Sequence, residues 1–453
     1  MTPPVTSTGS PSIPTEPPVV SGTNNSGTGS TSASTEGSDP AGETLNAGTG
    51  DLKGERAFQA DQFVDSIGVG THLTYDDTDY YLQWPKILQS LRELGVRHIR
   101  DGYFDNSNNS IYTRRHQALA DAGIKTTYVL QVRDAVTPSA IKSFSKNVND
   151  IDGFEAPNEC DALQNCGGGG LIGIANMMSL LPGFASSAHS AGSSLIGPSF
   201  VLPESYGVVG NLGSTIDYNN IHVYFGGRNP GSTGWGDYDR FGNSYGSFAY
   251  WMAASAVAAP TAPTVVTEAG YMSFPTPTAP YTISEETGGK YLPRLLLLSY
   301  LHGISRTFLY EFLDEFSSPA YGLIREDFSP KPAYLVIQSL IQQLSDPGPV
   351  FSPQLLDYTI NGGGPSMKHV LFQKRDGSFW LLLWLEESCY DPASMKREPV
   401  TPQTVTLQLN SKRKIQQLSS FNATGHVTVE SVESQTTGTT IDVSDQIIVL
   451  KIN

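Results

Sequence analysis

Between about residues 57 and 345, short apolar segments rich in β-branched residues alternate with longer segments of helical periodicity. Eight of the short segments predict buried strands, at 67–72, 96–103, 124–132, 151–159, 195–201, 218–225, 263–271 and 304–312. The helical segments fall at 85–94, 112–122, 138–148, 171–191, about 204–212, 245–258, 286–302 and 332–344. Glycines, the common helix stops, separate helix from strand at four of the junctions, Gly95, Gly123, Gly192 and Gly303.

Strands that alternate with helices predict an α/β fold with a parallel sheet and right-handed crossovers. Eight such units in under 300 residues favour a closed (β/α)8 barrel, of the TIM type. An open doubly wound sheet is the alternative, but it usually carries a glycine-rich phosphate turn after an early strand. Here Gly68 and Gly70 lie inside the first predicted strand. Pro293 should either kink the seventh helix or mark its true start.

The helical pattern stops after Asp346-Pro-Gly-Pro349. Segments 368–374 and 379–386 flank a hairpin signal at 375–378, and further strands are predicted at 404–409, 426–432 and 446–452. This pattern predicts a C-terminal all-β sandwich. We therefore divide the chain into a linker (1–50), a barrel (51–347) and a sandwich (348–453).

Residues 1–50 contain no aromatic residue, lysine or arginine, and Ser, Thr, Gly and Pro dominate. Such a segment buries too little apolar surface to offset its ordering entropy, so we expect a disordered linker. Linkers of this kind space a secreted or cell-surface domain from its anchor, and we expect that location here. The chain as given shows no signal peptide.

The net charge is −16, from 28 basic and 44 acidic residues without a basic cluster. This balance disfavours a nucleic-acid partner and repels polyanions, so it favours a neutral substrate. No stretch has the length and composition of a transmembrane segment, and we expect a monomer.

Cysteine and acidic patterns give little sign of a metal. Cys160 and Cys166 are six residues apart, and a disulfide between them and two free thiols are equally open readings; Cys389 has no evident partner. No His/Cys set has zinc spacing, and the acidic stretches 76–79 and 237–239 lack a calcium-loop pattern. We expect no metal and no cofactor.

The carboxyl ends of barrel strands form the active face, so polar residues there are informative. Taken singly, each has an ordinary structural explanation. Together they place one glutamate after strand four, another on strand seven and a His-x-Tyr pair on strand six. The residues at the predicted strand ends are His72, Arg100, Asp101, Asn158, Glu159, His222, Tyr224, Glu268 and Glu311.

This set resembles the retaining glycoside hydrolases of clan A, over roughly residues 60–345. The resemblance implies that Glu159 is the acid/base and Glu268 the nucleophile. It further implies that Arg100 and Tyr224 support Glu268, that Asn158 binds the sugar 2-hydroxyl and that His222 belongs to the strand-six pair. The sandwich after the barrel is similar to that of family 39 and its relatives, families 30, 51 and 79.

Two carboxyl groups suit this chemistry. Ionised Glu268 would attack the anomeric carbon, and protonated Glu159 would release the leaving oxygen and later activate water. Retention requires the two groups to lie ~5–5.5 Å apart.

One departure concerns strand eight, where clan A enzymes usually carry a tryptophan beneath the sugar. Here Tyr310 or Phe312 could replace it, or Glu311 could contact a hydroxyl. Aromatic residues in loops stack on sugars, and Tyr271 and Trp235 are candidates; Trp235 lies in the long glycine-rich loop 226–244.

We therefore predict a retaining glycoside hydrolase that cleaves O-glycosidic bonds of a polysaccharide or oligosaccharide, β-linked and endo-acting. Two alternatives stay open. A carbohydrate-binding protein on a barrel scaffold would not need both glutamates and Arg100, and a transglycosylase would share every catalytic residue.

Overall fold

The computed structural model describes residues 53–104, 110–132, 136–162, 166–232, 246–277, 279–315, 320–419 and 428–453. Eight parallel strands form one sheet in the order β7-β6-β5-β4-β3-β12-β9-β8. A parallel bridge from Ile196 to Tyr218 joins the two end strands and closes the ring. The strands are β3 (Ile67–Gly70), β4 (His98–Gly102), β5 (Lys125–Val129), β6 (Ile151–Glu155), β7 (Ser194–Ile196), β8 (Asn219–Tyr224), β9 (Thr264–Gly270) and β12 (Arg306–Leu309).

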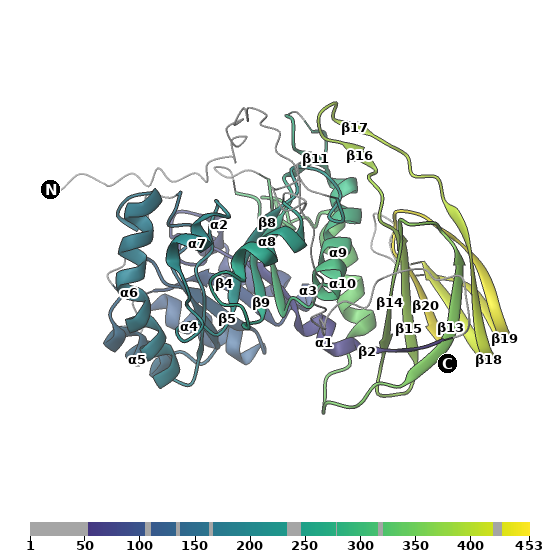
Figure 1. Cartoon of the computed structure of the whole chain (residues 1–453), viewed down its shortest axis with the longest axis horizontal. Coiled ribbons are helices and arrows are strands. Elements are labelled where there is room, and N and C mark those ends of the chain that lie inside the picture. Colours follow the sequence, from purple (N-terminus) through teal and green to yellow (C-terminus); the bar gives the residue numbers. More distant parts are fainter. Residues whose placement is uncertain are drawn as a thin grey trace, which may run out of the picture.

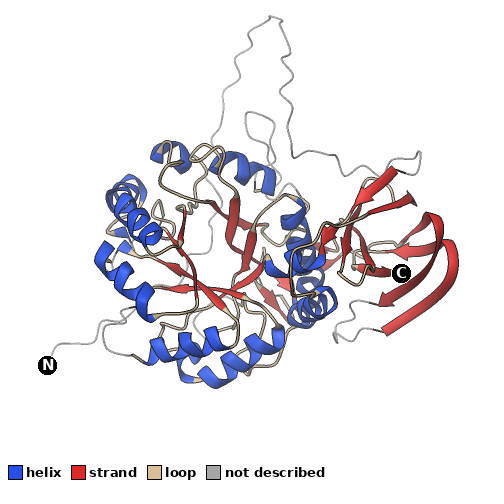
Figure 2. Cartoon of the chain, turned by 90° about the horizontal axis from the view of Figure 1, so that it is seen from below, coloured by secondary structure: helices blue, strands red, loops and turns tan. Residues whose placement is uncertain are grey.

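Helices surround this ring of strands (Figure 2). The main ones are α3 (Trp84–Leu94), α4 (Ile111–Asp121), α5 (Pro138–Asn147), α6 (Gly170–Ser190), α7 (Ser205–Val209), α8 (Phe248–Ser255), α9 (Glu285–Leu301) and α10 (Pro332–Leu344). Short elements join them: α1 (Ala60–Asp65), α2 (Asp79–Leu82), β10 (Ser273–Phe274) and β11 (Ile283–Ser284). The predicted (β/α)8 barrel is confirmed. Because α9 runs through Pro293, the reading that this proline starts the helix is wrong.

Local sequence explains where several helices begin. The side chains of Ser110, Thr137, Ser247 and Ser284 each accept a hydrogen bond from the backbone N–H three residues later, which satisfies a donor that the first helical turn leaves open. At the other end of α3, Gly95 has φ 84°, a left-handed conformation that favours glycine.

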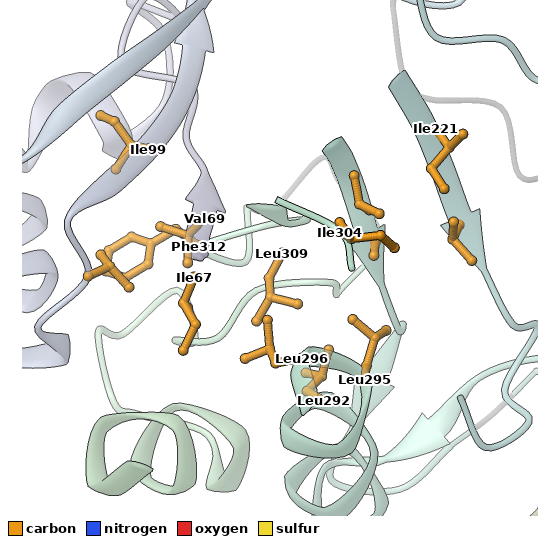
Figure 3. Close-up of a cluster of buried hydrophobic side chains, with 14 of the residues drawn as sticks. Ile67, Val69, Ile99, Ile221, Leu292, Leu295, Leu296, Ile304, Leu309 and Phe312 are labelled. Carbon is orange, nitrogen blue, oxygen red and sulfur yellow. The ribbon is translucent and has the colours of Figure 1, made fainter. Parts of the chain in front are cut away.

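The core lies between the strands and the helices. Figure 3 shows Ile67, Val69 and Leu309 of adjacent strands beside Leu295 and Leu296 of α9. These side chains are almost fully buried, and each large aliphatic group so buried contributes about 1.5–3 kcal/mol.

Helix α6 is long and apolar enough to cross a membrane by length and composition. It is nevertheless a barrel helix: it contacts α5 and β7, and its buried side chains include Leu181 and Phe184. Packing in the barrel therefore explains the buried apolar residues of α6, whereas Leu171 and Ile172 at its start are exposed.

The C-terminal residues form a second, mostly antiparallel sheet in the order β1-β13-β18-β20-β15-β14-β2, with β19 paired to β18 (Figure 1). This matches the expected C-terminal sandwich. Its strands are β13 (Leu355–Gly362), β14 (Met367–Gln373), β15 (Phe379–Leu385), β18 (Gln403–Ser419), β19 (Thr428–Val443) and β20 (Ile448–Ile452), and β16 (Tyr390–Asp391) and β17 (Lys396–Arg397) form a separate hairpin.

The expected boundary at residue 51 differs from the structure. Strands β1 (Lys53–Arg56) and β2 (Phe58–Gln59) precede the barrel in sequence but pair with β13 and β14 of the C-terminal sheet. Segments this short carry too little periodicity to reveal a partner about 300 residues away.

The C-terminal sheet packs directly on the barrel through α1 and α9. Phe372 of β14 contacts Phe63 of α1, with ring centroids 5.3 Å apart. Beside this apolar contact, Arg294 of α9 and Glu386 after β15 form a buried ion pair, in which Arg294 Nε donates to Glu386 Oε2 at 3.0 Å. One face of the C-terminal sheet thus joins the core of the barrel, and its other face has a separate apolar cluster.

The β1 pairing generates a truncation test. A chain that starts at Lys53 should match the parent in melting temperature. A chain that starts at Phe58 loses the β1–β13 pairing and the bond from His369 to Glu55, so it should lose about 2 kcal/mol or more of unfolding free energy. Thermal unfolding measures both, and a lower melting temperature for the first variant would contradict the expectation for residues 1–50.

Candidate active site

Four strand ends converge on one end of the barrel. Strand β4 carries Arg100, β8 carries His222 and Tyr224, and β9 carries Glu268, while Glu159 follows β6. Parallel strands present the same end to one face, so residues that are far apart in sequence meet there. The structure brings all five into direct hydrogen-bond contact with at least one other member.

Glu268 is held by two donors. Arg100 Nη1 lies 2.7 Å from Glu268 Oε1, and the Tyr224 hydroxyl lies 2.9 Å from Glu268 Oε2. Burial alone would raise the pKa of Glu268, but the charges of His222 and Arg100 and the Tyr224 bond outweigh it. The pKa therefore lies below its ordinary value, which keeps this carboxylate ionised.

Glu159 sits in the turn after β6, with φ 46°. Its Oε1 lies 2.8 Å from His222 Nδ1. One of these two atoms must carry a proton, because two bare acceptors would repel at this distance. Burial lowers the pKa of His222, yet the Glu268 charge and the contact with Glu159 raise it more, so the net pKa is above its ordinary value. His222 is therefore able to hold a proton beside Glu159.

The two glutamates are close together. One carboxylate oxygen of each, with a ring nitrogen of His222, lies within 4.8 Å of the others. Among the described residues, Glu159, His222 and Glu268 are the group whose possible ligand atoms lie close enough together to hold a metal ion. A cation is disfavoured there, because the Arg100 guanidinium already occupies Glu268 Oε1 and would repel it.

A second group of side chains lies at the ends of β3 and β12. His72 Nε2 contacts Glu311 at 3.2 Å, and Glu311 is almost fully buried. Burial lowers the pKa of His72, but the bond to Glu311 and its charge raise the pKa above the ordinary value. The Tyr310 ring lies 5.8 Å from the His72 ring and 5.4 Å from that of Tyr321.

Asn158 also belongs to the site, because its Oδ1 accepts from Arg100 Nη2 at 2.8 Å. Cys160 and Cys166 form a disulfide with a Cα–Cα distance of 5.4 Å. This bond closes the loop directly after Glu159. The buried carboxylate of Asp161 also braces this region, accepting from the backbone N–H groups of Val201 and Leu202.

The structure does not support Tyr271 as a sugar-binding residue, and it does not describe the other expected aromatic residue, Trp235. Tyr271 is only 2% exposed, its hydroxyl donates to the Arg228 carbonyl, and its ring packs on Phe225. Its assignment as a substrate contact is wrong, because a ring that follows a strand can turn into the layer between strands and helices. Trp235 lies outside the described residues.

Sequence reasoning missed three residues inside the barrel, Glu155, Asn220 and Thr267. Glu155 accepts two bonds from Arg100, at 2.6 and 2.9 Å. Asn220 Nδ2 also donates to Glu155, and the Thr267 hydroxyl lies 3.1 Å from Glu155 Oε1 and 2.7 Å from Asn220 Oδ1. A signal was present, since an arginine and a glutamate in two strands that are both expected to be buried need each other as partners.

No protein-family model matches the chain, and a search of curated proteins finds no match. A family 39 glycoside hydrolase from the gut symbiont Bacteroides cellulosilyticus WH2 matches with a TM-score of 0.58 and 16% identity, over 87% of this chain and 82% of that chain. The chain has the fold of this glycoside hydrolase.

Two further solved structures agree. The catalytic domain of family 30 xylanase C from Talaromyces cellulolyticus has a TM-score of 0.52 and 10% identity, over 88% of this chain and 98% of that chain. An α-L-arabinofuranosidase from Thermotoga maritima has a TM-score of 0.53 and 8% identity, over 89% and 98%. The expected resemblance to clan A is confirmed at the level of the fold.

The bond from Tyr224 to Glu268 generates a pH test. Tyr224→Phe removes a donor that lowers the pKa of Glu268, so that pKa should rise. Glu268 is the expected nucleophile, and a carboxylate nucleophile must be ionised, so the acidic limb of the kcat/KM profile should move up by roughly one pH unit, with an about tenfold loss of rate.

Tyr218→Phe is the matched control, because Tyr218 lines a small cavity with Asp152 and Arg306 away from the two glutamates. Its pH profile should equal that of the parent. An unmoved limb in Tyr224→Phe would contradict the role of this hydroxyl.

Proposed function

We propose that the protein is a retaining glycoside hydrolase. The observation that carries this proposal is the placement of Glu159 and Glu268: one carboxylate oxygen of each lies within 4.8 Å of the other, and of these two glutamates only Glu268 is hydrogen-bonded to Arg100 and Tyr224. Retaining enzymes place the two groups ~5–5.5 Å apart, and inverting enzymes leave ~6.5–9.5 Å for a water. The short separation favours the retaining route.

In the first step, a carboxylate oxygen of Glu268 forms a bond to the anomeric carbon, while the bond from that carbon to the leaving oxygen breaks. The leaving oxygen takes the proton of Glu159. Asymmetric hydrogen bonding supports these roles, because Arg100 and Tyr224 donate to Glu268 and keep it ionised, whereas Glu159 contacts neither of these donors and lies beside His222.

In the second step, Glu159 accepts a proton from water, and the water oxygen attacks the anomeric carbon. The bond to Glu268 breaks and its carboxylate returns to the donors Arg100 and Tyr224. Two inversions give net retention.

The sugar next to the cleaved bond would lie between the two glutamates and the strand-eight group. In this proposal Tyr310 takes the part of the tryptophan floor and His72 hydrogen-bonds a hydroxyl; the contacts of His72 with the Tyr310 ring and with the buried Glu311 support it. The acidic chain favours a neutral glycan, and the β linkage rests on the clan A resemblance. Endo action rests on the length and aromatic content of loop 226–244 in the sequence.

We also propose an extracellular setting for the enzyme. The Cys160–Cys166 disulfide supports it, because such bonds persist mainly in oxidising compartments. The linker composition of residues 1–50 is consistent with a secreted or surface-tethered protein.

Substitution of the two glutamates tests their roles. Glu268→Gln should lose turnover by on the order of 10³-fold or more, and Glu159→Gln by about 10²–10⁴-fold, while both remain folded. Near-parent activity in either variant would refute its assignment.

Azide separates the two roles, since it occupies the space of the missing carboxyl group. With an activated β-aryl glycoside, Glu159→Ala and azide should yield the β-glycosyl azide, and Glu268→Ala and azide the α-glycosyl azide. The reverse outcome would exchange the assignments.

The stereochemistry of the first product tests the double displacement. NMR of a β-linked substrate during hydrolysis should show the β anomer before mutarotation. An initial α anomer would exclude Glu268 as covalent nucleophile. A polysaccharide panel with reducing-end assay and product sizing identifies the glycan, and products longer than the substrate would indicate transglycosylation.

A further inference from the structure

Glu155 is a completely buried carboxylate at the end of β6, inside the barrel. A buried charge is unfavourable unless it is paired and hydrogen-bonded. Its partner is Arg100, which donates from Nε to Oε2 at 2.6 Å and from Nη2 to Oε1 at 2.9 Å. This two-point contact fixes the plane of the guanidinium.

The outer side of the Arg100 guanidinium faces Glu268 and Asn158. Nη1 donates to Glu268 Oε1 at 2.7 Å, and Nη2 also donates to Asn158 Oδ1 at 2.8 Å. Because the guanidinium is rigid and planar, holding its inner edge on Glu155 determines where Nη1 points. A rotation of Arg100 away from Glu268 would break both bonds to Glu155.

A second arm of contacts leads from Glu155 to the acid/base side. Thr267 Oγ1 lies 3.1 Å from Glu155 Oε1 and 3.0 Å from His222 Nε2. The other ring nitrogen of His222 contacts Glu159. One carboxylate therefore touches the networks that hold both glutamates of the proposed reaction.

Charge balance gives this arrangement a chemical consequence. Arg100 meets two carboxylates, so Glu155 offsets much of its positive charge, and Glu268 experiences a shared cation. Without the Glu155 charge, Glu268 would face an unshared guanidinium, which stabilises the ionised carboxylate more strongly and makes it a poorer nucleophile. The ionisable groups placed around Glu268 are Arg100, Glu159, His222, Tyr224, Tyr310 and Tyr321.

We propose that Glu155 is a positioning residue of the active site: it aims Arg100 at Glu268, balances the charge of Arg100, and through Thr267 orients His222 toward Glu159. This inference rests on the proposed glycosidase function. Glu155 does not contact the reacting atoms, so its role is distinct from that of Glu159 and Glu268.

The test is the pH dependence of kcat/KM for Glu155→Gln, measured with an activated aryl glycoside. The variant is isosteric but uncharged, so the acidic limb should move down by about one pH unit, opposite in direction to Tyr224→Phe. Because the Arg100 guanidinium would no longer be held in its orientation toward Glu268, kcat should fall by about 10- to 100-fold. Glu155→Asp keeps the charge at a shorter reach, so its limb should stay at the parent position while kcat falls.

Asp152→Asn is the matched control. Asp152 lies on the same strand β6, pairs with Arg306 and contacts His98 at 3.0 Å, away from the reacting glutamates. Asp152→Asn should lower the melting temperature and leave the acidic limb of the kcat/KM profile unchanged. Thr267→Val tests the second arm alone, with an about tenfold loss of kcat and an unmoved acidic limb.

The inference fails if the parent hydrolyses glycosides and Glu268→Gln does not, yet Glu155→Gln keeps the parent limb and kcat. Equal limb shifts in Glu155→Gln and Asp152→Asn would also overturn it. If Glu155→Gln does not fold, Glu155→Asp decides, and a parent-like kcat in that variant refutes the positioning role. Failure of the proposed function is distinguishable, because the parent itself would then show no hydrolysis.

Discussion

The pairing of the buried Arg100 guanidinium with two carboxylates is the interaction on which the candidate active site depends. A cation with only 8% of its side chain exposed needs close partners, since removing water from an unpaired charge is costly. It finds them in Glu155 of β6 and Glu268 of β9, and none of the three strands neighbours another in the sheet. The two ion pairs therefore cross the barrel interior and connect β4 with β6 and β9. The same contacts that stabilise this end of the barrel also fix the position of Glu268.

The C-terminal sheet shapes the same face from outside. Glu386 pairs with Arg294 of α9 and also accepts from the Asn229 side chain and the Gly231 backbone N–H, in the segment after β8. Gly231 has no room for a side chain, because an added Cβ would lie 2.2 Å from the Glu386 side chain. The strand that delivers His222 and Tyr224 is thus continued by a segment whose course the C-terminal unit determines.

Much of this arrangement follows from local sequence patterns. The eight strands and eight main helices were predictable because apolar residues recur every two residues in a strand and every 3.6 residues in a helix. These periods, and the glycines that end helices, can be recognised within a single short segment. Glu159 and Glu268 were predictable because strand order alone places their strand ends on one face. Tyr271 was mistaken for a sugar contact, because the same strand-end position is compatible with a side chain that turns toward α9. Glu155 was missed because its only signal is the pairing of a buried glutamate with a buried arginine on another strand, and a pattern within one segment does not show that pairing.

By itself, then, the sequence determined the order and kind of the elements, the closure into a barrel and the strand ends that carry Glu159 and Glu268. These depend on the spacing of residues along a single segment. Only the tertiary structure decided that Arg100 is shared by two carboxylates, that Thr267 links Glu155 to His222, and that residues 53–59 join the C-terminal sheet. These contacts join residues that lie far apart in the sequence, and they form because buried charges and open strand edges must find partners wherever the closed fold brings them within reach.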